Sequence, residues 1–325
     1  MTAMSIRVEP VDPQNVTLLL RWNGILRDGC AFGRQKAWSR SDEATRLQLQ
    51  NPHPIRRSVL LLAEIDGVPV GAAEAHAHPG EPADVEIAVL DVFRRRGVAR
   101  ALLHAVRDTL RGTATVMRTE TYSDAGVSFA RSEGMRIGVR ESRQVVDLPL
   151  PQGILDSLPG PPSNVEVISW VDACPEELLD DWARLRAHMS DDVPMGDLTR
   201  TAAPVDVAAV RRNEERMSEQ GYALVRSVAR IDGHSVGYTE ILLSRPDPTI
   251  ALQDDTFVEE RVRGRGIGRA LKVVNLRRLL SVPESAGSRF LQTYTALTNE
   301  PMLALNRSVG FEEVDVLTVL EGPLG

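Results

Sequence analysis

A glycine- and arginine-rich segment, residues 263–270 with the sequence RGRGIGRA, has the residue types and spacing best suited to chemistry. Glycines let backbone N–H groups converge on an anion, because no Cβ blocks the approach. A helix is expected to leave the segment, and its N-terminus would add the positive end of a dipole. The three arginines could add charge-assisted hydrogen bonds to phosphate oxygens. The segment therefore predicts a pyrophosphate site.

The same design occurs earlier in the chain, in residues 94–100 with the sequence RRRGVAR. A valine precedes each segment by the same spacing, and 169 residues separate Val89 from its counterpart Val258. Each copy also follows an I-D-G-x-x-V-G motif, at residues 65–71 and 231–237. Asp-Gly between apolar runs is a strong hairpin signal. Motifs repeated in one order indicate a duplicated domain, so we expect a phosphate site in each half.

Other phosphate-binding motifs fit these segments less well. Neither copy contains the G-x-x-x-x-G-K-[ST] pattern of the P-loop nucleotide triphosphatases. The Asp-Gly hairpin before each copy indicates antiparallel neighbours, which argues against a parallel dinucleotide-binding unit. The non-functional alternative is that each segment is only the solvent-exposed, arginine-rich start of a helix. The motifs around the segment are repeated as well, and this argues against that alternative.

The elements around the two loops predict an α/β fold with a mixed, mostly antiparallel twisted sheet and flanking helices in each half. A proline-rich stretch at residues 148–164 separates the halves, since proline suits a stiff extended connector. We expect domains at 1–150 and 163–325, joined by a linker at 151–162. In the first half the pattern predicts helical material around residues 13–27 and 41–50, and strands at 5–9, 59–65, 70–76 and 85–92.

Both segments resemble motif A of the GNAT acetyltransferases, Q/R-x-x-G-x-G/A. The second half is more specifically similar to the C-terminal half of actinobacterial tandem GNATs, on Gln253, Asp255, Thr256, Val258, Arg263–Gly268, Lys272, Asn299, Met302, Asn306, Gly310 and Phe311. The resemblance implies two tandem GNAT-like domains that use acetyl-coenzyme A and no metal. It also implies that the backbone N–H of Val258 polarises the thioester carbonyl, and that Asn299 or Asn306 contacts the pantetheine arm or sulfur. The residues expected to bind the coenzyme are Val89, Arg94, Arg95, Arg96, Gly97, Val98 and Ala99, and Val258, Arg263, Gly264, Arg265, Gly266, Ile267, Gly268, Arg269, Asn299 and Asn306.

Acyl transfer to an amine needs a proton acceptor for the amine and an acid for the departing thiolate. Asp255, three residues before Val258, ranks first as the base, and Glu240 on the preceding strand ranks second; Glu86 and Glu74 are their counterparts in the first half. A base in a cleft should have a raised pKa, because burial disfavours its charge.

The acid is harder to assign. Many GNATs place a tyrosine acid four residues before the final glycine, where this chain has Asn306 in one half and Ala130 in the other. Tyr294, with Tyr238 as a further option, is the proposed substitute.

Composition limits the partners. A net charge of -7 and the absence of a long basic run disfavour nucleic acid. No apolar stretch approaches the ~18 residues of a membrane span, and no signal peptide is evident in residues 1–10, so we expect a cytoplasmic protein. Cys30 and Cys174 have no metal-ligand spacing, and His76 and His78 lack a third ligand for zinc.

The sequence thus predicts an N-acetyltransferase that moves an acetyl group from acetyl-coenzyme A to the primary amine of a small molecule, as a monomer or homodimer. A non-catalytic acyl-coenzyme A sensor and a protein N-acetyltransferase are the alternatives.

Overall fold

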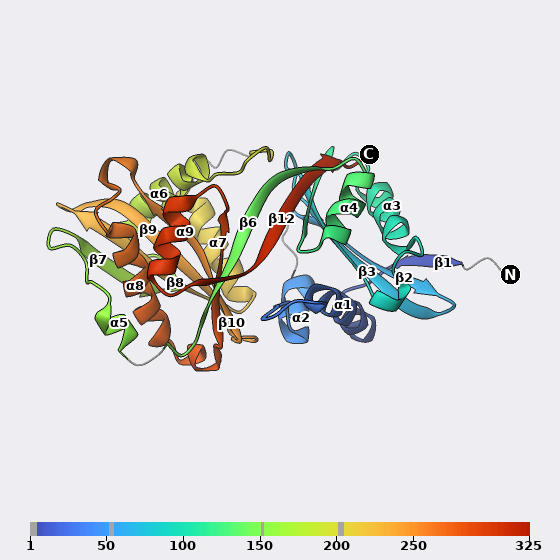
Figure 1. Cartoon of the computed structure of the whole chain (residues 1–325), viewed down its shortest axis with the longest axis horizontal. Helices are drawn as coiled ribbons and strands as arrows, with labels where there is room; N and C mark the ends of the chain where they lie inside the picture. Colours follow the sequence, from blue (N-terminus) through green and yellow to red (C-terminus); the bar gives the residue numbers. More distant parts are fainter. Residues whose placement is uncertain (1–4, 52–54, 151–152, 201–204) are drawn as a thin grey trace. The chain divides into compact units, whose positions relative to one another are not determined.

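The computed structural model describes residues 5–51, 55–150, 153–200 and 205–325 (Figure 1). The chain forms two compact units. The first comprises Met1–Arg140, Met195–Thr199 and Asp315–Gly325, and the second comprises Glu141–Pro194 and Arg200–Val314. Each unit has a mixed sheet with helices on both faces, in agreement with the predicted α/β class.

In the first unit the strands follow one another across the sheet as β1, β2, β3, β4, β5 and then the end of β12. Apolar side chains of α1 pack on one face of β2 and β3, and those of α3 pack on the other face. The bounds are β1 (Ile6–Pro10), α1 (Val16–Ala31), α2 (Asp42–Gln50), β2 (Arg57–Ile65), β3 (Val68–Ala77), β4 (Ala83–Val89), η1 (Asp91–Phe93), α3 (Val98–Leu110), β5 (Val116–Thr121) and α4 (Asp124–Ser132). The helices and strands predicted in this half are confirmed to within a few residues.

The second unit repeats this plan, with the order β7, β8, β9, β10, β11 and then part of β6. Helix α6 covers one face and α8 the other. The bounds are α5 (Ile154–Ser157), β7 (Glu166–Val171), η2 (Glu176–Leu178), α6 (Leu179–Asp192), α7 (Val207–Glu219), β8 (Tyr222–Ile231), β9 (His234–Ser244), β10 (Ile250–Val258), η3 (Glu260–Val262), α8 (Ile267–Leu280), η4 (Pro283–Gly287), β11 (Phe290–Ala296) and α9 (Glu300–Ser308).

Two long strands, β6 (Arg136–Asp147) and β12 (Glu312–Pro323), each begin in one unit and end in the other. Residues Glu141–Asp147 of β6 pair antiparallel with β11, and Thr318–Pro323 of β12 pair antiparallel with β5. The boundaries expected from sequence, 1–150 and 163–325, follow chain order and differ from these units. Alternation of side chains identifies a strand but not its partner. The expected linker also contains the short helix α5, and residues 151–152 lie outside the described part of the chain.

The two repeated I-D-G-x-x-V-G motifs form tight hairpins, as predicted. Asp66 and Asp232 have φ of 51° and 49°, and the glycine after each has φ of 78° and 80°. Positive φ at both central residues is the geometry of a type I′ turn. The last glycine of the motif serves packing: a Cβ on Gly237 would lie 2.6 Å from the Phe257 carbonyl oxygen.

Gly237→Ala should therefore destabilise the second unit by roughly 1–3 kcal/mol, because the clashing atom is strand backbone that cannot move aside. Gly160→Ala is the control, since a Cβ there meets nothing within 4 Å. Urea unfolding of both variants measures the difference. Equal midpoints for Gly237→Ala and the parent protein would contradict this packing argument.

Candidate functional site

The glycine-rich loop of the second unit runs from the end of β10 through η3 to the start of α8. Gly264 and Gly266 have φ of 76° and 78°, and Gly266 caps α8 with no side-chain hydrogen bond to its first N–H groups. In the first unit Gly97 caps α3 in the same way, and Arg95 has φ of 62° where the second unit has Gly264. A left-handed conformation is unfavourable for a residue with a Cβ, so the shared loop shape is specified strongly. Each loop offers helix N–H groups to an anion.

The first arginine of each loop contacts the end of its own strand. Arg263 Nε donates to the Val258 carbonyl oxygen at 2.8 Å, and its Nη2 pairs with Asp192 at 2.5 Å. Arg94 Nε donates in the same way to the Val89 carbonyl oxygen at 3.2 Å. These two guanidinium groups fix the loop to the end of its strand. Of the other arginines in the second loop, Arg265 is exposed.

The sheet of each unit opens beside the loop. β10 pairs with β11 only over Ile250–Leu252, and β4 pairs with β5 only over Ala83 and Asp84. Beyond these short parallel segments, the edges of β10 and β4 that face the next strand have no strand partner among the described residues.

The strand register directs one N–H group into each opening. Glu259 N donates to the Val236 carbonyl oxygen at 2.9 Å. Pairs in an antiparallel ladder alternate between hydrogen-bonded and non-hydrogen-bonded, so Val258, which lies opposite Gly237, is in a non-hydrogen-bonded pair. Its N–H therefore points away from β9 and into the gap. Leu90 N donates to Val70 O at 3.0 Å, which orients Val89 likewise.

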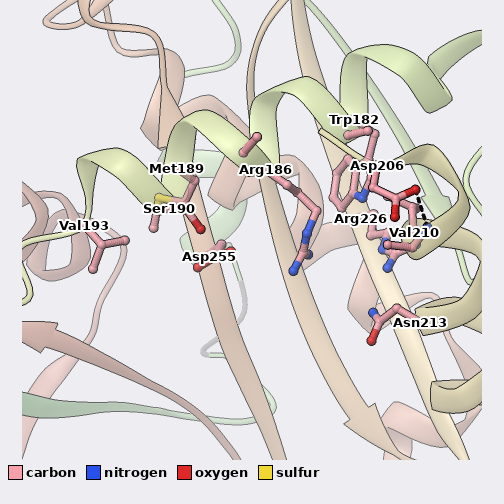
Figure 2. A pocket seen from close by; sticks show the side chains of 13 residues that line it. Trp182, Arg186, Met189, Ser190, Val193, Asp206, Val210, Asn213, Arg226 and Asp255 are labelled. Atoms are coloured by element: carbon pink, nitrogen blue, oxygen red, sulfur yellow. Dashed lines mark hydrogen bonds between the residues drawn. The ribbon is translucent and has the colours of Figure 1, made fainter. Parts of the chain in front are cut away.

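A cavity of about 270 Å³ lies on the α6 face of β10 (Figure 2). The side chain of Arg186 reaches from α6 towards the strands that carry Arg226 and Asp255 (Figure 2). Polar and aromatic residues that line the cavity are Trp182, Arg186, Asp206, Asn213, Arg226 and Asp255. The space suits a small polar molecule.

Asp255 is placed in this cavity by a bulge, because the β9–β10 register shifts between Gln253 and Thr256. The Tyr238 hydroxyl donates to Asp255 Oδ2 at 2.8 Å. Burial raises the pKa of Asp255, although the Arg186 charge opposes the shift. A raised pKa is what the sequence led us to expect of a base here.

Glu240 has different surroundings. Its side chain is buried and pairs with Arg226 Nε at 2.5 Å and with Arg186 Nη1 at 2.8 Å. Burial would raise the pKa of Glu240, but the two guanidinium groups outweigh it and hold the pKa below its usual value. The expectation of a raised pKa is therefore wrong for Glu240. Both of its oxygens are committed to ion pairs, so the geometry favours Asp255 as the base.

The remaining predicted residues lie around α9 and β11. Asn299 caps α9 and accepts from Met302 N at 3.3 Å. Asn306 is fully buried, and its Nδ2 donates to Gln144 at 2.8 Å, while its Oδ1 has no partner among the described residues. Tyr294 is half-buried on β11 and does not line the cavity.

The first unit contains a polar cluster that the sequence reasoning missed. In one tautomer, Ser58 Oγ donates to His76 Nδ1 at 3.0 Å, and His76 Nε2 donates to Glu74 at 2.6 Å. Arg40 pairs with the same carboxylate. Ser58 lies directly opposite His76 across the predicted hairpin, in a register that a bulge between Ala63 and Glu64 shifts by one residue, and the alternation of side chains does not reveal that shift. The second unit has Leu224 opposite Leu242 instead.

Within the described ranges, no cluster of three or more His, Cys, Asp or Glu side chains could hold a metal ion. None of the helices in the same ranges is long and apolar enough to cross a membrane.

Known proteins resemble this chain in both sequence and fold. Residues 26–131 match the model of the acetyltransferase (GNAT) family. The chain is 29% identical over 273 residues to a mycothiol acetyltransferase of Thermomonospora curvata, covering 82% of this chain and 83% of the relative. It is 28% identical over 273 residues to a mycothiol acetyltransferase of Salinispora arenicola, covering 83% of each.

Solved structures share the fold over the whole chain. A tandem GNAT protein from the clavulanic acid biosynthesis pathway superposes with a TM-score of 0.81 at 23% identity, covering 99% of both chains. A GCN5-related N-acetyltransferase from Sphaerobacter thermophilus gives a TM-score of 0.67 at 17% identity, covering 98% of this chain and 96% of that chain.

Gly266→Asp should weaken coenzyme A binding by the second unit ~100-fold or more, because the variant places a negative side chain on a left-handed residue beside the expected pyrophosphate. Gly97→Asp is the matched change in the first unit. Isothermal titration calorimetry gives affinity and stoichiometry, and each variant should remove one class of site. Two unchanged sites in Gly266→Asp would contradict the loop assignment.

Glu74 generates a prediction for acid stability. Burial opposes its charge, yet Arg40 and His76 lower the pKa of Glu74 from 4.5 to about 2. A carboxyl with a depressed pKa stabilises the fold above its unfolded pKa and loses that contribution as the pH falls through the folded value. The parent protein should lose ~3 kcal/mol between about pH 4.5 and 2 through this group. Urea unfolding at successive pH values should show that the Glu74→Gln variant lacks this part of the pH dependence of the free energy of unfolding. An identical pH dependence in the variant and the parent would contradict the prediction.

Proposed function

We propose that this chain, which resembles the tandem GNAT proteins in sequence and fold, transfers the acetyl group of acetyl-coenzyme A to the primary amine of a small molecule. One observation carries the proposal: the gap beside β10 receives the Val258 N–H, and a small polar cavity with Asp255 lies on one face of the same strand. An acyl group in the gap would lie next to an amine in the cavity. A carbonyl that gains negative charge during attack is stabilised by a fixed N–H donor.

The chain's own residues supply the remaining steps. The N-terminus of α8, which no side chain caps, holds a pyrophosphate through backbone N–H groups, and Arg263 keeps that loop against β10. The coenzyme supplies the acetyl group as a thioester. Asp255 accepts the proton that the amine loses, helped by a pKa closer to neutrality than that of an exposed carboxyl.

The acceptor is a polar amine small enough for the cavity. Carboxylates of Asp206 and Asp255 and the guanidinium group of Arg186 line it, so both an ammonium group and an anionic or hydroxyl-bearing part of an acceptor find partners. The names of the relatives make a precursor of mycothiol the first acceptor to test. The size of the cavity favours a small molecule over a protein N-terminus or lysine.

We further propose that both units bind the coenzyme. The two loops share their left-handed residues, the strand-end arginine and the orientation of the valine N–H. The family model lies over the first unit, whereas the cavity with Asp255 lies in the second. A binding role without turnover is the second candidate for the first unit, because Ala130 occupies the position of the usual tyrosine acid.

Asp255→Asn should lower turnover ~100-fold or more, the usual scale of general-base assistance. The loss should shrink at high pH, where more of the amine is unprotonated without help. Parent activity should rise as the pH passes through the raised pKa of Asp255, because only the ionised form accepts a proton. Thiol release measures turnover, and calorimetry should show unchanged coenzyme binding.

Asp180→Asn is the matched control, since it changes an exposed aspartate of α6 that does not line the cavity. Near-full turnover by Asp255→Asn at neutral pH would rule out Asp255 as the base while leaving the coenzyme site in place.

A further inference from the structure

Lys272 on α8 is a buried amine that the reaction described above does not use. Its side chain is only 2% exposed. The ammonium nitrogen lies 5.7 Å from the centre of the Phe311 ring, and no hydrogen bond or carboxylate partner is found for it among the described residues. Burying an unpaired ammonium group is unfavourable by several kcal/mol. The matching position of the first unit, 169 residues earlier, is the buried Leu103. A leucine would therefore be sufficient if this position served packing alone.

Lysine is also rare in this chain. Lysine and arginine together number 38, and only Lys36 and Lys272 are lysines. Arginine stays protonated at every physiological pH, whereas a buried lysine readily gives up its proton. Lys272 is the deeply buried one of these two lysines. The chain therefore has, at this buried position, a cation that can act as an acid.

The position of Lys272 follows from that of Gly268, one helical turn earlier. A Cβ on Gly268 would lie 3.8 Å from Val258 Cγ2 and 3.1 Å from Leu305 Cδ2. The loop reverses the direction of the chain, so α8 runs back over β10. The four residues from Gly268 to Lys272 span ~6 Å along the helix axis. That is about two strand residues, so we infer that Lys272 lies near the level of Thr256. The side that it shares with Gly268 faces α9, which places the amine beside the gap between β10 and β11.

The two faces of the gap then carry different ionisable groups. Asp255 and Glu240 lie on the α6 face together with Arg186 and Arg226, in or beside the cavity. Lys272 lies on the α8 face, where burial is the one cause that lowers its pKa, to about 7, so that no neighbouring acid or second cation contributes. On α9, the residue at the usual position of the tyrosine acid is Asn306, which cannot donate a proton as an acid does.

We propose that Lys272 is the proton donor for the thiolate that leaves when the acetyl group is transferred. The inference rests on the proposed acetyl transfer. The C–N bond forms as the C–S bond breaks, the amine proton passes to Asp255, and the Lys272 ammonium group gives a proton to sulfur. Solvent then returns the proton of Asp255 to Lys272, and the balance is one acetyl thioester and one amine giving one amide and one thiol. Acid and base therefore act from opposite faces of one opening.

The test uses Lys272→Met, which keeps the length of the side chain, and Lys272→Leu, which restores the residue of the first unit. Lys36→Met is the control lysine change. Calorimetry compares coenzyme A with desulfo-coenzyme A, which lacks the sulfur, for the second-unit site. Near pH 7, where Lys272 is still partly protonated, the parent should prefer coenzyme A ~10-fold, because the ammonium group forms a charge-assisted hydrogen bond with the sulfur, and both Lys272 variants should lose the preference.

Kinetics supply the second readout. Turnover should fall ~100-fold in both Lys272 variants with little change in the KM for acetyl-coenzyme A. The decline of parent turnover above about pH 7, where Lys272 loses its proton, should disappear. An unchanged sulfur preference together with turnover within about twofold of the parent would overturn the proposal.

The two proposals fail in distinguishable ways. If no amine is acetylated but the sulfur preference depends on Lys272, acetyl transfer is wrong and the contact of Lys272 with sulfur stands. A chain that binds neither ligand overturns both.

Discussion

The short parallel contact between β10 and β11 is the constraint on which the site of the second unit depends. Three residue pairs hold the strands together at Ile250–Leu252, and then they separate. A longer ladder would occupy the Val258 N–H and close the sheet. Both strands are held apart by their other neighbours. β9 pairs with β10 up to Val258, and β6 pairs with β11 along the whole length of β11. The opening is thus a product of strand pairing.

Buried charge is distributed so that one carboxylate stays available. Arg226 is fully buried between Glu240 and Glu214, with distances of 2.5 Å to each, and Arg186 completes the pairing of Glu240. Breaking a buried pair leaves an uncompensated charge and is strongly destabilising. These groups therefore form a fixed wall of the cavity. Among the described residues, the Asp255 carboxylate accepts one hydrogen bond, from the Tyr238 hydroxyl, and it can change its charge without dismantling the wall.

Local features of the structure could be predicted from sequence, and pairings between distant segments could not. The Asp-Gly turns, the capping glycines and the helices after them depend on a few neighbouring residues, so Gly97 and Gly266 were found directly. The exchange of β6 and β12 depends on which edges meet, and alternation of side chains does not encode that. The surroundings of Glu240 differ from the expectation because a bulge between Ala229 and Arg230 shifts the register of the predicted hairpin and sets Arg226 opposite Glu240.

Comparison of the two units separates what the coenzyme requires from what the acceptor requires. The loop shape persists even where Arg95 must adopt a left-handed backbone, which indicates that the anion site tolerates little change. The strand faces beside the openings have diverged: Ser58 and His76 stand where the second unit has Leu224 and Leu242. Leu103 and Lys272 differ on the helix face in the same way. Under the proposed function, in which both loops bind one kind of coenzyme, the divergence concerns the groups proposed to move protons and bind acceptors, and we expect the duplicated units to have different chemical tasks.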